Sequence, residues 1–435
     1  MKKFILILAC VLFSMMAVGS DPVQIRVQLS AWWTPGVFVG HQVYYDMLKN
    51  EFLPAHPEIE IQHTYIPFAE IIPTILRGAL VQDLPDVMYI DNPDVMYLAQ
   101  AGALRDLTPW IEEWGQWEDF FVGSRYATTM NGRVYAVQYG TNNLALFYNK
   151  DYFELAGIKT PPQTWDELVE TCRILAAKLP PGVYPFGVSA IDSDEGAWQF
   201  LAFLWSNGGS LLELDQPPAI EALRLWVDLV KNGFMPKDVV MWTQTMDLME
   251  QFAAGRIAMM INGCWILPDL KARKINYGIS YVPVPKAGLK PIVAIGGETF
   301  AISPFSPEDK ARAAWEFIKF LTDAKNMARL CAALGYVPVR SSAVPLTLAL
   351  NPELEIFAKQ AETALPRPAM GGELKYPEVS AIMRRYVQKA LVGDMTPEAA
   401  FTTAAKEIRA LFTEDEYNKY AAQARELLAK VRGGK

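Results

Sequence analysis

The N-terminal part of the chain alternates between strand patterns and helix patterns. Residues 25–29 and 59–65 alternate apolar and polar side chains, and residues 86–90 form a short apolar run of the buried type. Helices are predicted between and after these strands, over 39–52, 68–80 and 94–101. This order predicts an α/β fold with mainly parallel sheets flanked by helices, in which ligands bind beyond the carboxyl ends of the strands.

The segment 147–168 shows how the sequence bounds its elements. Asp151 is expected to cap a short helix that ends at Gly157, and Pro161-Pro162 prevents its continuation. Thr164 and Glu167 form a capping-box pattern at the start of the next helix, whose apolar residues share one face. We expect this segment to build helices rather than to contact a ligand.

The rest of the chain continues in mixed strands and helices. Strands are predicted over 133–139, 144–148 and 257–261, and over 292–303 with an interruption at Gly296-Gly297. Helices are predicted over 219–230 and 246–254, and again after Ser306 and after Pro352. At roughly 150 residues per domain, the length predicts two or three domains.

The N-terminus has the pattern of a secretory signal. Met1-Lys2-Lys3 precedes an apolar run from Phe4 to Val18, and Ala17-Val18-Gly19 is a small-residue cleavage pattern. We therefore expect residues 1–19 to be a cleaved signal peptide and the mature protein to be periplasmic or otherwise extracytoplasmic. The alternative of an uncleaved anchor is less favoured, because the apolar run is shorter than the ~20 residues that span a bilayer. Lipidation at Cys10 is also less favoured, because the chain stays apolar after it.

The charge balance argues against two classes of partner. Without Lys2 and Lys3 the mature chain has 38 basic residues (40 minus 2) against 48 acidic ones, a net charge of −10. An acidic chain without a basic tract is not expected to bind nucleic acid or an anionic membrane surface.

Familiar catalytic and metal-binding patterns are missing from the sequence. It contains no HExxH, no His/Cys cluster, no EF-hand spacing, no phosphate-binding glycine loop and no GxSxG. We therefore predict no metal and no cofactor. Three widely spaced cysteines could form one disulfide but are better interpreted as buried small hydrophobes; they are Cys172, Cys264 and Cys331.

Aromatic residues gather near the predicted ends of elements. They are Trp32, Trp33, Trp198, Trp205, Trp242, Trp265 and Tyr336. Indole rings can cover the apolar face of a pyranose, although any single tryptophan is more often a core residue. Trp32 and Trp33 form the stronger signal, because neighbouring residues at a strand end point to opposite sides and are not easily both core. Asp91 follows a buried strand and either contacts ligand or only caps a helix.

A series of landmarks appears in a fixed order along the mature chain. They are Glu51-Phe52 with Pro57-Glu58-Ile59, Pro85-Asp86-Val87 with Asp91, the runs 98–104 and 131–137, the segment 147–168, the run 252–260, Gly263-Cys264-Trp265, Gly296-Gly297, the run 335–340, and Arg367-Pro368. Together they resemble family 1 of the extracellular solute-binding proteins, the maltose-binding-protein-like sugar-binding proteins of ABC importers.

The resemblance implies a two-lobed fold of periplasmic binding proteins, type II-like, with a hinge between α/β lobes. Lobe 1 would comprise 20–139 and 296–345, and lobe 2 would comprise 140–295 and 346–435 with a helical tail. It also implies a monomer that closes on a carbohydrate and delivers it to a membrane permease.

The resemblance assigns the cleft to Trp32 or Trp33, Asp91, Asn142 or Asn143, and Trp265. Asparagine at 142 and 143 departs from the family pattern, in which an acidic residue is frequent. The full set of predicted ligand-binding residues is Trp32, Trp33, Asp91, Asn142, Asn143, Trp198, Trp242, Trp265, Gly297, Glu298, Tyr336 and Arg367. Arg340 and Arg367 are nevertheless of a residue type that is more typical of the surface.

Two alternatives stay open at this point. Paired carboxylates could make the chain a secreted carbohydrate-active hydrolase. The same fold could instead bind a non-sugar solute such as glycerol phosphate, which would need clustered cations, whereas Arg256, Arg340 and Arg367 are scattered in sequence.

Overall fold

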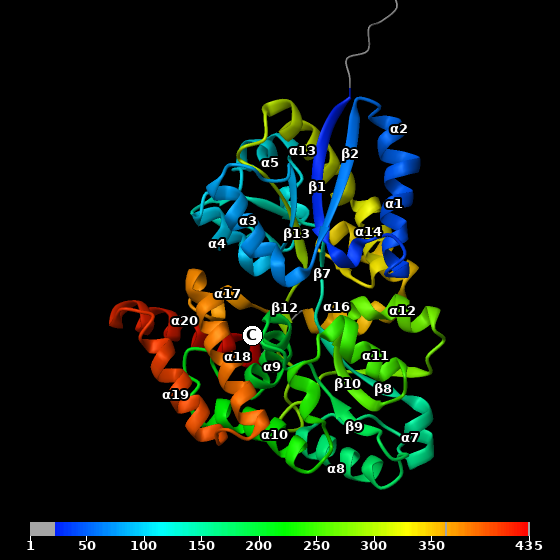
Figure 1. Cartoon of the computed structure of the whole chain (residues 1–435), viewed down its shortest axis with the longest axis vertical. Helices are drawn as coiled ribbons and strands as arrows, with labels where there is room; N and C mark the ends of the chain where they lie inside the picture. The colour runs from blue at the N-terminus through cyan, green and yellow to red at the C-terminus, as the bar shows by residue number, and fades with distance from the viewer. Residues whose placement is uncertain (1–21, 362, 434–435) are drawn as a thin grey trace, which may run out of the picture.

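The structure is a computed structural model that describes residues 22–361 and 363–433. Two bodies, one above the other in Figure 1, are each built on a sheet flanked by helices. We call the upper body, which contains the N-terminal strand, lobe 1 and the lower body lobe 2. The predicted signal peptide, residues 1–19, lies outside the described residues. In the described ranges no helix is long and apolar enough to cross a membrane.

The sheet of lobe 1 has five strands of mixed direction. Its order is β2 (Ile59–Ile66), β1 (Val23–Ser30), β3 (Val87–Asp91), β13 (Glu298–Ile302) and β6 (Ala136–Gln138). β1 runs parallel to β2 and β3, whereas β13 runs antiparallel to β3 and β6. The prediction of a mainly parallel sheet is wrong here, because β13 joins from a distant part of the chain, which local patterns do not reveal.

The sheet of lobe 2 is also mixed. Its order is β11 (Tyr277–Ser280), β8 (Leu144–Asn149), β10 (Ile257–Gly263) and β9 (Tyr184–Gly187). β8 is antiparallel to both of its neighbours, and only β10 and β9 run parallel. Every residue of β10 is buried. The apolar run Ile257–Ile261 within it therefore reflects a strand that is covered on both faces.

The helices of lobe 1 cover its sheet with amphipathic faces. The first helical segment is α1 (Gln42–Met47), which continues through a π turn, Leu48–Phe52, into α2 (Leu53–Ala55). The other helices of this lobe are α3 (Ile71–Leu80), α4 (Val95–Gln100), α5 (Thr108–Trp114), α6 (Val122–Ala127), α13 (Glu308–Thr322) and α14 (Ala324–Leu334).

The helices of lobe 2 include the whole C-terminal tail (Figure 1). They are α7 (Lys150–Ala156), α8 (Trp165–Ala176), α9 (Asp194–Ser206), α10 (Pro217–Lys231), α11 (Met249–Ala253), α12 (Leu267–Ala272), α16 (Glu355–Ala361), α17 (Arg367–Met370), α18 (Tyr376–Val392), α19 (Pro397–Arg409) and α20 (Glu414–Gly433), while α15 (Val344–Leu350) leads from lobe 1 into this set. α9 is buried along almost its entire length, so its N-terminal residues are held firmly in place.

The predicted boundaries around the segment 147–168 are mostly confirmed. Thr164 Oγ1 accepts a hydrogen bond from the Glu167 amide at 3.2 Å, and the Glu167 carboxylate accepts one from the Thr164 amide at 3.3 Å. α7 ends at Gly157, which has a φ of 73°. The predicted cap of α7 is wrong, because Asn149 rather than Asp151 accepts the backbone hydrogen bonds of the first turn.

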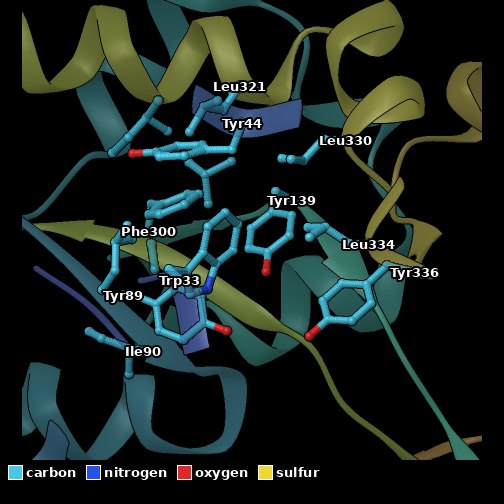
Figure 2. Close-up of a cluster of buried hydrophobic side chains, with 14 of the residues drawn as sticks. Trp33, Tyr44, Tyr89, Ile90, Tyr139, Phe300, Leu321, Leu330, Leu334 and Tyr336 are labelled. Carbon is cyan, nitrogen blue, oxygen red and sulfur yellow. The ribbon is translucent and has the colours of Figure 1, made fainter. Parts of the chain in front are cut away.

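An aromatic cluster fills the core of lobe 1 (Figure 2). Trp33 is 1% exposed and meets the rings of Tyr44, Tyr89 and Tyr139 edge-on, at centroid distances of 5.0, 5.8 and 6.1 Å. Edge-to-face pairs of this kind stabilise a core beyond the area that they bury. The three cysteines predicted to be buried hydrophobes are free thiols in the cores: Cys172, Cys264 and Cys331.

Short strands occupy the junction between the lobes (Figure 1). β7 (Gly140–Thr141) pairs with β14 (Val337–Pro338), and β12 (Ala294–Ile295) pairs with β15 (Leu365–Pro366). Gly297 lies between these ladders with a φ of 108°, and a Cβ there would collide with the Gly140 carbonyl. Glycine is therefore required because the junction strands approach closely. The residue boundaries assigned to the lobes from sequence stay a prediction.

Candidate functional site

One cavity lies between the lobes and takes its walls from both. Its empty volume, which includes space open to solvent, is about 660 Å³. Lobe 1 and its junction provide Trp32, Phe38, His41, Phe68, Asp91, Asn142, Glu298, Leu334 and Tyr336, and lobe 2 provides Asp194, Glu195, Trp198, Gln244, Thr245, Trp265 and Arg367.

Aromatic rings form two of the cavity walls. In lobe 1, Trp32 stacks on Phe68 with a centroid distance of 4.8 Å and an interplanar angle of 15°. In lobe 2, Trp198 and Trp265 meet as a corner, with centroids 6.0 Å apart and planes at 68°. Glycine at Gly296 leaves room for the Trp198 ring, because a Cβ there would overlap it. The cavity can therefore hold a flat, partly apolar ligand face between the lobes.

Several polar atoms at this cavity have no hydrogen-bond partner within the described part of the chain. The N–H donors are Nε1 of Trp198, Nε1 of Trp265 and Nε of Arg367, and an acceptor is Oδ1 of Asn142. Buried polar groups are rarely left unpaired, because each loses its hydration without compensation. These atoms are therefore candidates to form hydrogen bonds with a bound molecule or with water.

Arg367 is held between two carboxylates at the cavity wall. Its Nη2 donates to both carboxylate oxygens of Asp91, at 2.9 and 2.7 Å, and its Nη1 donates to Asp194. Its guanidinium also lies over the Trp198 ring, 4.5 Å from the centroid. Burial would raise the pKa of Asp194, but Arg367 and Arg384 outweigh burial and hold that pKa below its ordinary value. For Asp91, burial raises the pKa and Arg367 offsets part of the rise.

Glu298 forms the polar floor of the cavity on the lobe 1 side. Its two carboxylate oxygens accept hydrogen bonds from the hydroxyls of Tyr139 and Tyr336, both at 3.3 Å. Figure 2 shows these two hydroxyls and that of Tyr89 directed to one region. Burial, with a further contribution from the nearby charge of Asp91, raises the pKa of Glu298 to about 7.

Glu195 and His41 complete the polar lining. Glu195 accepts a hydrogen bond from the Gln244 amide at 2.7 Å, and burial raises its pKa to about 7. Burial lowers the pKa of His41 to about 3, so the ring is neutral at ordinary pH. The cavity thus combines aromatic faces, carboxylate acceptors and N–H donors, and its only cation among the described lining residues is Arg367.

The structure brings eight of the predicted ligand-binding residues to this cavity. They are Trp32, Asp91, Asn142, Trp198, Trp265, Glu298, Tyr336 and Arg367. Arginine is more typical of the surface, but Arg340 and Arg367 are both buried here, at 6% and 1% exposed. Arg340 lies away from the cavity, in lobe 1, where it pairs with Asp119 at 2.8 Å.

Four predicted residues do not line the cavity. Trp33 is enclosed in the core of lobe 1, whereas its neighbour Trp32, in the same 3-10 turn, lines the cavity. Asn143 is turned away, because its Nδ2 donates to the Phe357 carbonyl at 2.9 Å. Trp242 packs against the hydrophobic clusters of the protein. Gly297 serves the close approach at the junction instead.

The sequence reasoning missed several lining residues of both lobes. They are Phe38, His41, Phe68, Asp194, Glu195, Gln244, Thr245 and Leu334. One signal was available: Asp194 and Glu195 stand at the start of a helix, one turn before Trp198. Acidic side chains in a first turn also favour the helix dipole, so their presence alone does not indicate a binding site.

Comparisons with known proteins agree with this architecture. A family model described as bacterial extracellular solute-binding protein matches residues 48–356. The chain belongs to this family of extracellular solute-binding proteins. The two-lobed fold and the cavity between the lobes are therefore those of a solute-binding protein, and the resemblance noted from the sequence is confirmed.

Solved structures and a curated relative resemble this solute-binding protein over nearly its whole length. A maltose-bound MalE3 of T. maritima is 28% identical, with a TM-score of 0.79, and covers 89% of this chain and 100% of its own. A glycerophosphocholine complex of UgpB from Mycobacterium tuberculosis is 22% identical, with a TM-score of 0.78, and covers 90% and 98%. The sn-glycerol-3-phosphate-binding periplasmic protein of Pectobacterium atrosepticum is 22% identical over 434 residues, 94% of this chain and 96% of its own.

Among residues 22–361 and 363–433, no group of three or more His, Cys, Asp or Glu side chains is arranged to hold a metal ion.

Proposed function

We propose that this protein is the substrate-binding subunit of an ABC importer and that it captures a carbohydrate between its lobes. The observation that carries the proposal is the mixture of unpartnered groups at one cavity. Nε1 of Trp198 and Nε1 of Trp265 can only donate, whereas Oδ1 of Asn142 can only accept. A ligand with many hydroxyls satisfies both kinds, because each hydroxyl donates and accepts.

The aromatic walls support the same ligand class. The Trp32–Phe68 pair and the Trp198–Trp265 corner offer apolar faces to the C–H face of a pyranose. Carboxylates such as Glu195 and Glu298 can accept from its equatorial hydroxyls. Hydrogen bonds contribute about 0.5–1.5 kcal/mol each between uncharged groups and about 1.5–3 kcal/mol each to charged groups, so several of them give the ~8 kcal/mol of micromolar binding. A di- or oligosaccharide is the ligand that we expect, and the maltose bound to the T. maritima relative supports this class.

Glycerol phosphate is the second candidate, because relatives such as the P. atrosepticum protein are named for it. A phosphate would favour free cationic donors. Here the one arginine at the cavity is already bound by Asp91 and Asp194. This arrangement favours an uncharged solute.

Delivery to a permease follows from closure of the lobes. A ligand that contacts Trp32 on one lobe and Trp265 on the other binds the closed state more tightly, so it shifts the population towards that state. The closed lobes would then present one composite surface to the membrane partner.

Titration calorimetry and thermal shift with maltose, trehalose, cellobiose, xylobiose and mannobiose test the proposal. We expect micromolar binding and a raised Tm with at least one sugar. No response to any sugar, together with a clear shift from polyamines, metal ions or sn-glycerol-3-phosphate, would overturn the carbohydrate assignment. Chromogenic glycosides test the alternative of a hydrolase, and steady product release would establish it.

A further inference from the structure

Arg367 is embedded in carboxylates that come from both lobes. Asp91 ends a strand of lobe 1, whereas Asp194 and Arg367 belong to lobe 2. The side chain of Arg367 is 0% exposed, and its Nη1 and Nη2 are both used by the two carboxylates. Asp194 is fixed further by the hydroxyls of Tyr376 at 2.8 Å and Ser380 at 3.1 Å. We call Asp91, Arg367 and Asp194 the interlobe triad.

The charge of the interlobe triad does not favour an anion. Two carboxylates face the Arg367 guanidinium, and Asp194 also lies 3.9 Å from Nη1 of Arg384, so the positive charge of Arg367 is already balanced. Burial would raise the pKa of Asp194, but Arg367 and Arg384 outweigh burial and hold it below its ordinary value, so that Asp194 stays ionised. Glu195 and Glu298 line the same cavity, and burial raises the pKa of each to about 7, so they add negative charge only above that pH. An anionic ligand at Arg367 would have to displace a carboxylate or sit beside two of them in a medium of low dielectric constant, where like charges repel strongly.

One group of Arg367 is left for the ligand. Its Nε has no hydrogen-bond partner in the described part of the chain, and Arg367 is one of the residues that line the cavity. The other buried arginine makes a useful contrast. Nε of Arg340 donates to Asp119, Nη1 to the Thr322 carbonyl and Nη2 to Gln116, each at 2.8 or 2.9 Å. Arg340 thus has every nitrogen satisfied within its own lobe, as a structural pair does, and Arg367 does not.

We propose that the interlobe triad is a specificity device that makes the cavity reject anionic solutes. Asp91 and Asp194 neutralise the Arg367 guanidinium, and only its Nε remains to donate to an uncharged acceptor such as a sugar oxygen. Because Asp91 reaches Arg367 across the lobe boundary, the rejection is complete only when the lobes are closed. The inference rests on the proposed function, since it concerns the same cavity.

The decisive test removes one negative charge of the interlobe triad and keeps the size of the side chain. Asp194→Asn leaves the contact between Asp91 and Arg367 intact, whereas Asp91→Asn also weakens the contact between the lobes. Titration calorimetry with sn-glycerol-3-phosphate, inorganic phosphate and the five disaccharides is run on the wild type and on both variants. Asp119→Asn is the matched control, because it neutralises the partner of a buried arginine in lobe 1 away from the cavity.

We expect the wild type and D119N to show no binding of either anion. D194N should gain affinity for sn-glycerol-3-phosphate by tenfold or more, and D91N should gain less, because it also loses an interlobe contact. Anion binding by the wild type overturns the inference, and so does a folded D194N with the same anion affinity as D119N. If D194N does not fold, the comparison of anion affinity between the wild type and D91N takes its place, and a folded D91N with the same anion affinity as D119N overturns the inference.

The outcomes separate this inference from the proposed function. Sugar binding by the wild type without an anion gain in D194N would refute the triad alone. An anion gain in D194N without any sugar response in the wild type would support the triad and refute the carbohydrate assignment.

Discussion

Replacing Glu298 by Gln should abolish one specific component of the pH dependence of stability. Glu298 is 5% exposed, and its carboxyl faces the hydroxyls of Tyr139 and Tyr336 and the charge of Asp91. Burial, with the Asp91 charge, raises its pKa from an ordinary 4.5 to about 7. Gln keeps the size of the side chain and stays uncharged, as the protonated acid does.

The sign and size follow from linkage. Above pH 4.5 the unfolded chain releases the Glu298 proton, whereas the folded protein keeps it until about pH 7. The stability that Glu298 contributes is therefore complete below pH 4.5 and is lost as the pH rises through 7. Each pKa unit corresponds to about 1.4 kcal/mol, so the loss is on the order of 3 kcal/mol. E298Q does not titrate and escapes this loss.

Urea unfolding at pH 4.5 and pH 8, followed by circular dichroism, measures the effect. The wild type and E298Q should have similar free energies of unfolding at the acid end. At pH 8 the variant should be more stable by about 3 kcal/mol. E60Q is the control, because Glu60 is exposed on β2 and its variant should follow the wild type at both pH values. Parallel pH profiles for E298Q and the wild type would refute the reasoning.

Three further predictions concern neighbouring or equivalent side chains. Trp33→Ala should lower the free energy of unfolding by about 3–5 kcal/mol, because the ring fills the core, whereas Trp32→Ala should mainly weaken sugar binding. Urea titrations measure the first effect and titration calorimetry the second. Equal losses of stability in the two variants would contradict the assignment. Trp265→Ala should lower sugar affinity tenfold or more while circular dichroism stays native, and unchanged affinity would make Trp265 a core residue. A thiol reagent such as DTNB should label none of the buried cysteines in the folded protein and all of them in urea, and rapid labelling without urea would be inconsistent with the burial of Cys172, Cys264 and Cys331.

Many helices and strands, and the residues at which they end, could be predicted from the sequence. The capping box at Thr164, the helix end at Gly157 and the buried strand β10 depend on residues within a few positions of each other. Their signals are periodicity, side-chain caps and glycine conformation, which act locally. Strand direction in the sheets was not accessible, because β13 pairs with β3, which lies far from it in sequence.

The predicted ligand-binding residues show the same limit: local sequence indicated some of them, but only the packed structure shows which of them line the cavity. Aromatic type and proximity to strand ends correctly placed Trp32 and Asp91 at the cavity, but the same argument could not separate Trp32 from Trp33. Neighbouring residues point in different directions, and only the packed core of lobe 1 shows which of the two is enclosed. Asn142 and Asn143 were likewise indistinguishable until the second was found paired with Phe357.

The sequence by itself determined the α/β class, the local elements, the family resemblance and the kinds of residue that could meet a sugar. Only the tertiary structure shows which of these residues lie together at one cavity. Asp91 and Arg367 are 276 residues apart, and no local pattern predicts that they bind each other across the cavity. The physical reason is that hydrogen bonding, burial and pKa depend on the groups that folding brings into contact, whatever their distance along the chain.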